Sequence, residues 1–227
     1  MEVFQSGQGV FNNSPEHVYY ANPRPEMMNL LPNSAQKILD VGCGSGSFAR
    51  ALKNQKPGRE IWGIEINEVV GAEARKNVDK VLVGDIGQLM ENLPAKYFDA
   101  VYFNDVLEHL ADPYTILRRI GQHLTPDAKI LVSLPNARHI RNLFNFIVKK
   151  DWEYTDHGVL DRTHLRFFTL KSALRMFDSL GLEVESYQGI VSTGKWFMRP
   201  LNWLFFGYFE DTLYLQYAFK VKVRHVD

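Results

Sequence analysis

The fold is decided by residues 39–46, which read Leu39-Asp40-Val41-Gly42-Cys43-Gly44-Ser45-Gly46. An apolar run before this stretch predicts a buried strand at 37–41, and helical spacing follows at 47–54. Glycines at such a junction let the chain turn sharply and let a ligand approach the backbone. Their G-x-G-x-G spacing differs from the G-x-G-x-x-G of dinucleotide sites, and Asp40 would repel a pyrophosphate. The stretch therefore predicts a strand, a turn and a helix that hold a zwitterionic, cationic ligand.

Working outward from this stretch, strands and helices alternate along the chain. Apolar runs predict further strands at 60–64, 80–83, 98–103 and 128–134, and helical spacing occurs at 68–77 and 114–124. This alternation is typical of a parallel sheet with helices on both faces. A helix at 169–180 precedes strands at 182–190 and 214–223, between which no crossover helix is predicted. The sequence thus predicts a doubly wound, seven-stranded, mostly parallel α/β sheet with an antiparallel last strand.

Length and composition limit the class of protein. The chain has 227 residues, 26 Lys and Arg, 26 Asp and Glu, and one cysteine. A formal net charge of zero argues against nucleic-acid binding, which needs clustered positive charge. A lone Cys43 allows no internal disulfide and favours a cytoplasmic location. No apolar run is long enough for a membrane span.

The absence of repeats and linkers predicts one domain over residues 1–227. Within it, residues 1–36 are expected to form an N-terminal cap, and 137–168 and 191–213 to form insertions on the substrate side.

Acidic residues end two more of the predicted strands. Glu65 follows the second strand and Asp85 the third. A lone strand-end acid is usually just solvated, but ligands of such sheets bind at the carboxyl ends of the strands. Together with Asp40 and the glycines, these acids predict a shared ligand site, in which Glu65 could accept the hydroxyls of a ribose and Asp85 an adenine amino group.

These motifs, LDVGCGSG (39–46), GIEIN (63–67) and VGDI (83–86), resemble those of the class I S-adenosylmethionine-dependent methyltransferases. The resemblance covers about residues 19 to 223. It implies that the glycines surround the methionine part of the cofactor, that Glu65 holds the ribose, and that Asp85 and Ile86 meet the adenine. The cofactor-binding residues expected in full are Asp40, Gly42, Cys43, Gly44, Gly46, Glu65, Ile66, Asp85, Ile86 and Asn104.

Three further motifs, NDVLEHL (104–110), LPNARH (134–139) and LDRTHLRFFT (160–169), resemble a subfamily often found with bacterial polysaccharide genes. This resemblance implies O-methylation of a sugar, a nucleotide sugar or a glycan hydroxyl. N-methylation, or O-methylation of a small molecule of secondary metabolism, stays open. So do two functions of other classes, a nicotinamide oxidoreductase and a module that binds S-adenosylmethionine without catalysis. Ser47 at the end of the glycine run argues against the oxidoreductase.

Histidines and acids provide candidates for the reaction itself. His164 is the first candidate for a general base, because imidazole titrates near neutral pH, and His109 is a second catalytic candidate. The alternative for His164 is a core or helix-capping histidine. Asp105-x-x-Glu108-His109 resembles the E-x-x-E-H motif with which small-RNA 2′-O-methyltransferases and ubiquinone-pathway O-methyltransferases bind a divalent metal. The resemblance implies a metal site of Asp105, Glu108, His109 and His164; without metal, Glu108 and His109 would brace the cofactor pocket.

Aromatic side chains are dense between residues 196 and 217. We expect this segment to be a flap over the substrate, a homodimer face, or a surface that docks on a membrane carrying a lipid-linked substrate.

Overall fold

The computed structural model describes residues 24–192, 202–203 and 206–224. Most of the predicted N-terminal cap and the aromatic residues Trp196, Phe197 and Phe205 lie outside these ranges. The strands are β1 (Lys37–Val41), β2 (Glu60–Glu65), β3 (Lys80–Val83), β4 (Phe98–Asn104), β5 (Leu124–Pro135), β6 (Leu182–Ser192) and β7 (Tyr214–Val223). The α-helices are α2 (Pro25–Met28), α3 (Ser47–Gln55), α4 (Glu68–Ala74), α5 (Ile86–Leu89), α6 (Pro113–Ile120), α7 (Ile140–Phe144) and α8 (Leu170–Ser179). The short helical turns are η2 (Met90–Asn92), η3 (Leu107–His109), η4 (Gly121–His123), η5 (Asn145–Lys149) and η6 (Glu210–Leu213).

All seven strands form one sheet in the order β3-β2-β1-β4-β5-β7-β6. The first five strands are parallel, and β7 runs antiparallel to both β5 and β6. The predicted doubly wound sheet with an antiparallel last strand is therefore confirmed. Because β1 and β4 are neighbours whose connections leave in opposite directions, their carboxyl ends form the crevice in which ligands of this architecture bind.

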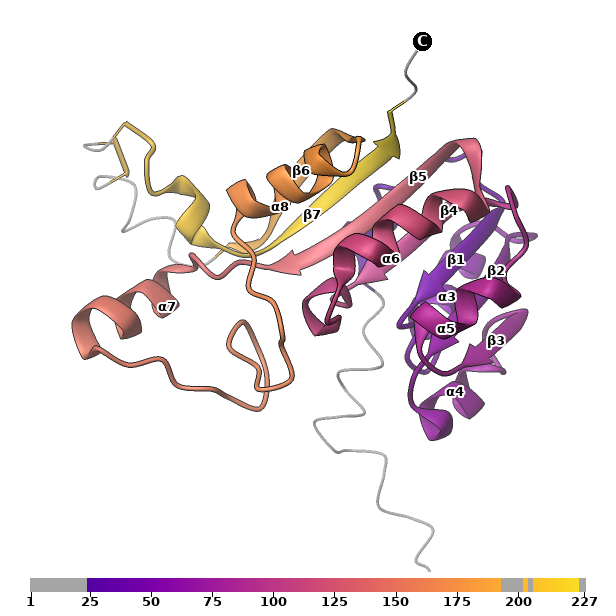
Figure 1. Ribbon diagram of the computed structural model, residues 1–227, viewed down its shortest axis with the longest axis horizontal. Coiled ribbons are helices and arrows are strands. Elements are labelled where there is room, and N and C mark those ends of the chain that lie inside the picture. The colour runs from indigo at the N-terminus through magenta and orange to yellow at the C-terminus, as the bar shows by residue number, and fades with distance from the viewer. Residues whose placement is uncertain (1–23, 193–201, 204–205, 225–227) are drawn as a thin grey trace, which may run out of the picture.

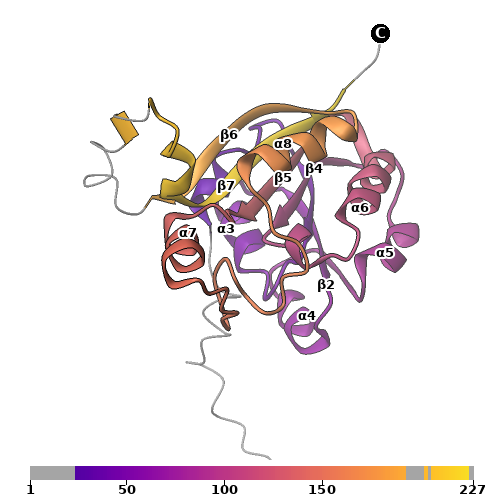
Figure 2. The same ribbon diagram turned by 60° about the vertical axis from the view of Figure 1, so that its left-hand side comes forward.

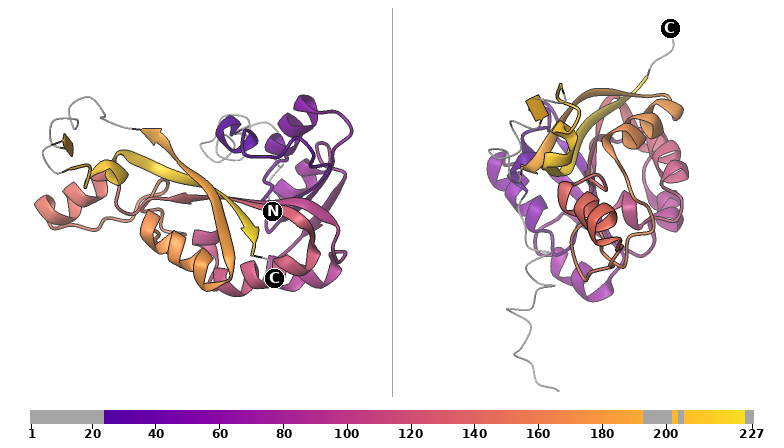
Figure 3. Two further views of the ribbon diagram at one scale, coloured as in Figure 1. Left: turned by 90° about the horizontal axis from the view of Figure 1, so that it is seen from above. Right: turned by 90° about the vertical axis from the view of Figure 1, so that its left-hand side faces the viewer.

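Helices cover both faces of the sheet, as the view from above shows (Figure 3). Strand residues alternate between the two faces because successive side chains point to opposite sides. On one face, Leu39, Val101 and Val132 pack in a large apolar core with residues of α6 and α8. On the other, Ile38, Ala100 and Leu131 pack with residues of α2 and α3. The central strands are thus buried on both sides and hold their carboxyl ends in fixed positions.

The elements differ from the sequence prediction mainly at their ends. The helix predicted over 114–124 ends at Ile120, and β5 already begins at Leu124. Pro126 lies inside this longer strand. Its neighbour β4 shifts register there, between Phe98 and Ala100, and such an irregularity in the strand pairing tolerates proline. The helix predicted over 169–180 is α8, whose Thr169 closes a capping box with Ser172.

One end of the molecule carries two segments outside the sheet. Helix α7 with η5, and the chain from residue 206 to η6, lie together at the end remote from β3 (Figures 1 and 2). An ion pair joins the two segments, with Arg138 Nε 2.6 Å from an oxygen of Asp211. No helix in the described part of the chain is both long and apolar enough to cross a membrane.

Candidate functional site

The glycine turn takes its shape from left-handed backbone at every second residue. Gly42, Gly44 and Gly46 have φ of 71°, 54° and 76°, a region that other residues adopt at a cost. A Cβ on Gly42 would lie 2.5 Å from a methyl carbon of Val106. The turn is fastened to β2, because the amides of Gly42 and Cys43 both donate to the carbonyl of Ile64. Glycine is therefore required at position 42 for both conformation and space.

Asp40 is a buried carboxylate without a protein partner. Its residue is 1% exposed, and neither oxygen has a hydrogen-bond partner. Burial, together with the nearby charge of Glu65, raises the pKa of Asp40 to about 7, while Arg24 acts in the opposite direction. An unpaired buried carboxylate is costly, so a cationic ligand beside it would be stabilised. The side chain thus fits an ammonium or sulfonium group, as expected from the sequence.

Glu65 joins the end of β2 to the glycine turn. One carboxylate oxygen accepts the Gly44 amide at 3.0 Å and the other accepts the Asn67 amide at 3.0 Å. A carboxylate has about four acceptor positions, so two remain for the hydroxyls of a ribose. The geometry fits the expected role of Glu65 in holding a ribose. It adds a structural role that the sequence did not indicate, since Glu65 also fastens the backbone amides of Gly44 and Asn67.

The remaining expected cofactor residues surround the same strand ends. Ile66 is 73% exposed just beyond β2. Asp85 is exposed and caps α5, accepting the Gly87 amide at 2.8 Å. Ile86 is buried in the core and begins α5, so its backbone is better placed than its side chain to meet an adenine. Asn104 ends β4, and its buried side-chain oxygen has no partner.

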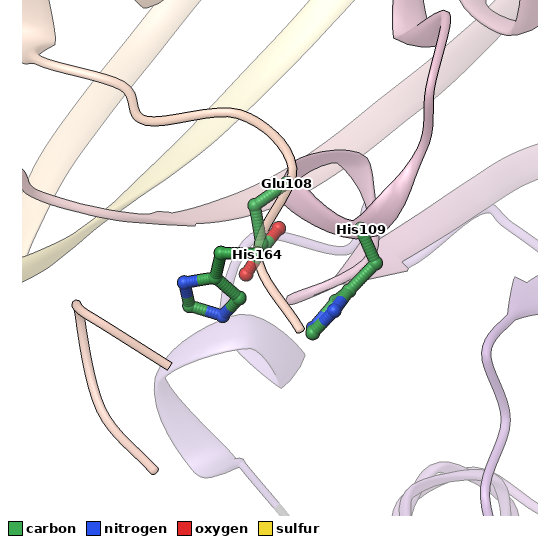
Figure 4. A group of neighbouring side chains, drawn as sticks. All are labelled: Glu108, His109 and His164. Atoms are coloured by element: carbon green, nitrogen blue, oxygen red, sulfur yellow. The ribbon is translucent and has the colours of Figure 1, made fainter. Parts of the chain in front are cut away.

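Glu108, His109 and His164 form a group of converging metal-type donors (Figure 4). Ligand atoms from the three side chains all lie within 4.8 Å of one another. Two of the residues come from η3 after β4, and His164 comes from the loop before α8. That loop is held against η3 because the amides of Leu165 and Arg166 donate to the carbonyl of Glu108 at 2.8 and 3.0 Å.

Each of the three groups is prepared to bind a cation. Nδ1 of His164 lies 3.0 Å from the carbonyl of Val159, and Nδ1 of His109 lies 3.3 Å from the carbonyl of Thr163. A carbonyl only accepts, so Nδ1 donates in both rings, and Nε2 is the ring atom that a neutral imidazole would offer to a metal. Burial, and then the charge of His164, lowers the pKa of His109, which favours the neutral ring.

Glu108 is 1% exposed, and neither of its carboxylate oxygens has a partner. Burial and the neighbouring Asp105 raise its pKa well above the usual range. Two imidazoles and one carboxylate suit a divalent transition metal. A bound cation would compensate the orphaned buried carboxylate, so the residues present fit such an ion.

Asp105, the fourth expected ligand, lies outside this donor group. Its carboxylate forms an ion pair with Arg24 and accepts hydrogen bonds from Ser133 Oγ at 2.7 Å and Gln216 Nε2 at 3.2 Å. Asp105 has a left-handed φ of 54°. The chain is therefore not helical from Asp105 to Glu108, and the two carboxylates do not point to one ion. The structure thus brings three of the four expected ligands together.

Arg24 is a site residue that sequence reasoning missed. It precedes α2, its side chain is 11% exposed, and besides Asp105 it contacts Gln216 at 3.3 Å. It also pairs with Glu26 at 3.1 Å. Asp105 and Gln216, however, lie 81 and 192 positions away in sequence, so no local pattern could reveal these two partners. The one available signal is the following Pro25, which often begins a helix.

Known proteins resemble this chain in both sequence and fold. A family model described as a methyltransferase domain matches residues 16–187. An Idiomarina loihiensis ubiquinone biosynthesis O-methyltransferase is 28% identical over 163 residues, 69% of this chain and 65% of that protein. The mitochondrial ubiquinone biosynthesis O-methyltransferase of Saccharomyces cerevisiae is 26% identical over 223 residues, 87% of this chain and 71% of that protein.

A solved methyltransferase from Archaeoglobus fulgidus superposes with a TM-score of 0.64 at 20% identity, covering 91% of this chain and 94% of that one. None of these names is linked to polysaccharides, so the polysaccharide subfamily expected from the sequence is not supported. The chain spans slightly less than two thirds of the Idiomarina protein. The chain belongs to the methyltransferase domain family.

Proposed function

We propose that this chain uses S-adenosylmethionine to methylate a hydroxyl oxygen of a small molecule, with a divalent cation held by Glu108, His109 and His164. The observation that carries the proposal is the convergence of three donors within 4.8 Å, with both Glu108 oxygens buried and unpartnered. A bound divalent cation lowers the pKa of a coordinated hydroxyl. A neutral amine attacks with its own lone pair and needs no prior loss of a proton, so a metal site of this kind favours O-methylation over N-methylation.

In this proposal the two parts of the site have separate tasks. Asp40, the glycine turn and Glu65 hold the cofactor at the carboxyl ends of β1 and β2. The donor group after β4 orients the acceptor oxygen toward the transferable methyl, and this positioning supplies most of the acceleration because the sulfonium is already activated. Methyl transfer from sulfur to oxygen leaves S-adenosylhomocysteine, and the acceptor gives up one proton.

Aromatic residues beside the donor group indicate the acceptor. Phe167 lies 6.3 Å from the ring of His164, and Trp152 and Tyr154 lie 5.3 and 6.3 Å from Phe167. Such a cluster suits a planar ring. We therefore propose a hydroxylated aromatic acceptor, which agrees with the quinone pathway named for the relatives. A sugar or glycan acceptor has no comparable support.

Transfer of a labelled methyl group to a panel of acceptors tests this proposal. The panel holds catechols and phenols, sugars and nucleotide sugars, and amines, each with and without a chelator. We expect transfer to the phenolic acceptors, its loss with chelator, and its recovery with a divalent ion. Activity that persists in chelator would remove the metal and leave His164 as a general base. Transfer to amines alone would overturn O-methylation.

A further inference from the structure

An exposed apolar surface lies on the segment that joins β5 to the donor loop. Helix α7 and η5 contain no buried residue. Phe144, Phe146, Ile147 and Val148 are each between 51% and 67% exposed. Phe144 ends α7 and the other three lie in the π-helical turn η5, so the four apolar side chains are grouped within about one turn of helix. A run of large apolar groups facing water marks a surface that something covers.

A second exposed aromatic group stands beside this helix. Trp203 is 82%, Phe206 100% and Tyr208 69% exposed. The two groups are neighbours, since Arg138 pairs with Asp211 and lies 5.7 Å from the ring of Tyr208. Both occupy the same end of the molecule (Figures 1 and 3). We refer to residues 144, 146–148, 203, 206 and 208 as the apolar end.

Positive charge accompanies the apolar end. Arg141, Lys149 and Lys150 are exposed on the same helical segment, which has no acidic residue between 140 and 150. Lys149 Nζ lies 6.0 Å from the ring of Phe144, so a cation sits directly beside the apolar face. The acids Asp151 and Glu153 come only after the helix. Exposed apolar side chains flanked by cations are typical of helices that lie in the headgroup region of an anionic bilayer.

The apolar end also continues toward the reaction site. Phe146 lies 6.0 Å from Trp152, Trp152 lies 5.3 Å from Phe167, and Phe167 lies 6.3 Å from His164. A surface in contact with lipid would therefore connect to the donor group through aromatic rings.

We propose that the apolar end docks this enzyme on the surface of an anionic lipid bilayer. Phe144, Ile147 and Val148 enter the boundary between headgroups and acyl chains, Trp203 and Tyr208 lie at headgroup level, and Arg141, Lys149 and Lys150 meet the lipid phosphates. This contact is peripheral and reversible. The inference does not depend on the metal or on the acceptor, since it concerns a surface outside the donor group.

Sedimentation with lipid vesicles tests the proposal on the full chain. The wild type should bind vesicles of phosphatidylcholine with phosphatidylglycerol and bind pure phosphatidylcholine at least tenfold more weakly. Ile147→Glu, at a 67% exposed position, should reduce binding at least tenfold. Its matched control is Val69→Glu, at a 75% exposed position on α4, which should bind like the wild type. Calorimetric binding of S-adenosylhomocysteine by each variant shows that the fold is intact.

Charge is tested in the same assay. Removing two cations with Lys149→Gln and Lys150→Gln should weaken binding to anionic vesicles about thirtyfold, about fivefold for each lysine. The pair Lys76→Gln and Lys171→Gln, exposed elsewhere, should have no effect. Three results would overturn the proposal: an equal loss of vesicle binding in both lysine pairs, no vesicle binding by the wild type, or a dimer that Ile147→Glu dissociates. The dimer would assign the surface to a second copy of the chain.

Discussion

Replacing Glu65 by alanine should change cofactor affinity and stability by separable amounts. In the free protein the side chain accepts the buried Gly44 amide and the more accessible Asn67 amide, each at 3.0 Å. Alanine leaves the Gly44 donor unsatisfied, which costs about 1–3 kcal/mol of stability, whereas water can reach the Asn67 amide. Loss of the acceptor for the ribose hydroxyls should cost a further ~1–3 kcal/mol of binding free energy, about 5- to 150-fold in Kd.

Two measurements separate these effects. Chemical denaturation without ligand gives the stability cost, and calorimetric titration with S-adenosylhomocysteine, under conditions in which the variant is folded, gives the change in Kd. Asn67→Ala is a useful comparison, because its backbone amide still donates to Glu65 while its own side chain no longer caps α4. Unchanged affinity for Glu65→Ala, with a large loss of stability, would refute the ribose role and leave Glu65 as a purely structural group.

Three further predictions concern the rest of the site. His164→Ala should lower turnover by about two to four orders of magnitude with little change in cofactor affinity, and equal losses in turnover and affinity would contradict its place on the acceptor side. Because burial raises the pKa of Asp40 to about 7, its ionised fraction rises about tenfold between pH 6 and 8. Cationic S-adenosylmethionine should therefore bind up to about tenfold more tightly at pH 8. The unliganded protein should lose stability as the pH rises from about 4, where an unfolded aspartate ionises, to about 7, and the loss should level off above that pH. A flat Kd profile, or one that Asp40→Asn leaves unchanged, would refute this. Gly42→Ala should destabilise the protein more than Gly58→Ala in thermal unfolding, because both have positive φ but only the first Cβ meets Val106, at 2.5 Å. Equal losses would show that conformation alone matters.

The cofactor side of the site could be predicted because local sequence determines it. Asp40, the glycines and Glu65 lie at the ends of two adjacent parallel strands. Once the strands are recognised from their apolar runs, topology alone brings these residues together. The backbone bonds that Glu65 accepts could not be predicted, since they depend on the path of the turn.

The donor side could be predicted only in part. Glu108 and His109 are neighbours in sequence, and the resemblance of the later segment indicated His164. Asp105 lies outside the donor group because its carboxylate is paired with Arg24 and Gln216, which come from opposite ends of the chain. Helix α7 was also missed, because its apolar residues face outward and give no signal of a buried face.

The hydrogen bonds from Leu165 and Arg166 to the Glu108 carbonyl also determine where this chain tolerates variation. Thr155 bonds to both Leu160 and Arg162, which closes 155–162 into a compact loop next to that anchor. An insertion there would shift His164 relative to Glu108. Residues 140–150 have no such attachment to the donors, and Phe146 reaches them only through the ring of Trp152. Loop exchange between related enzymes should therefore succeed at 140–150, giving new surface behaviour with the chemistry retained, and fail a few residues later.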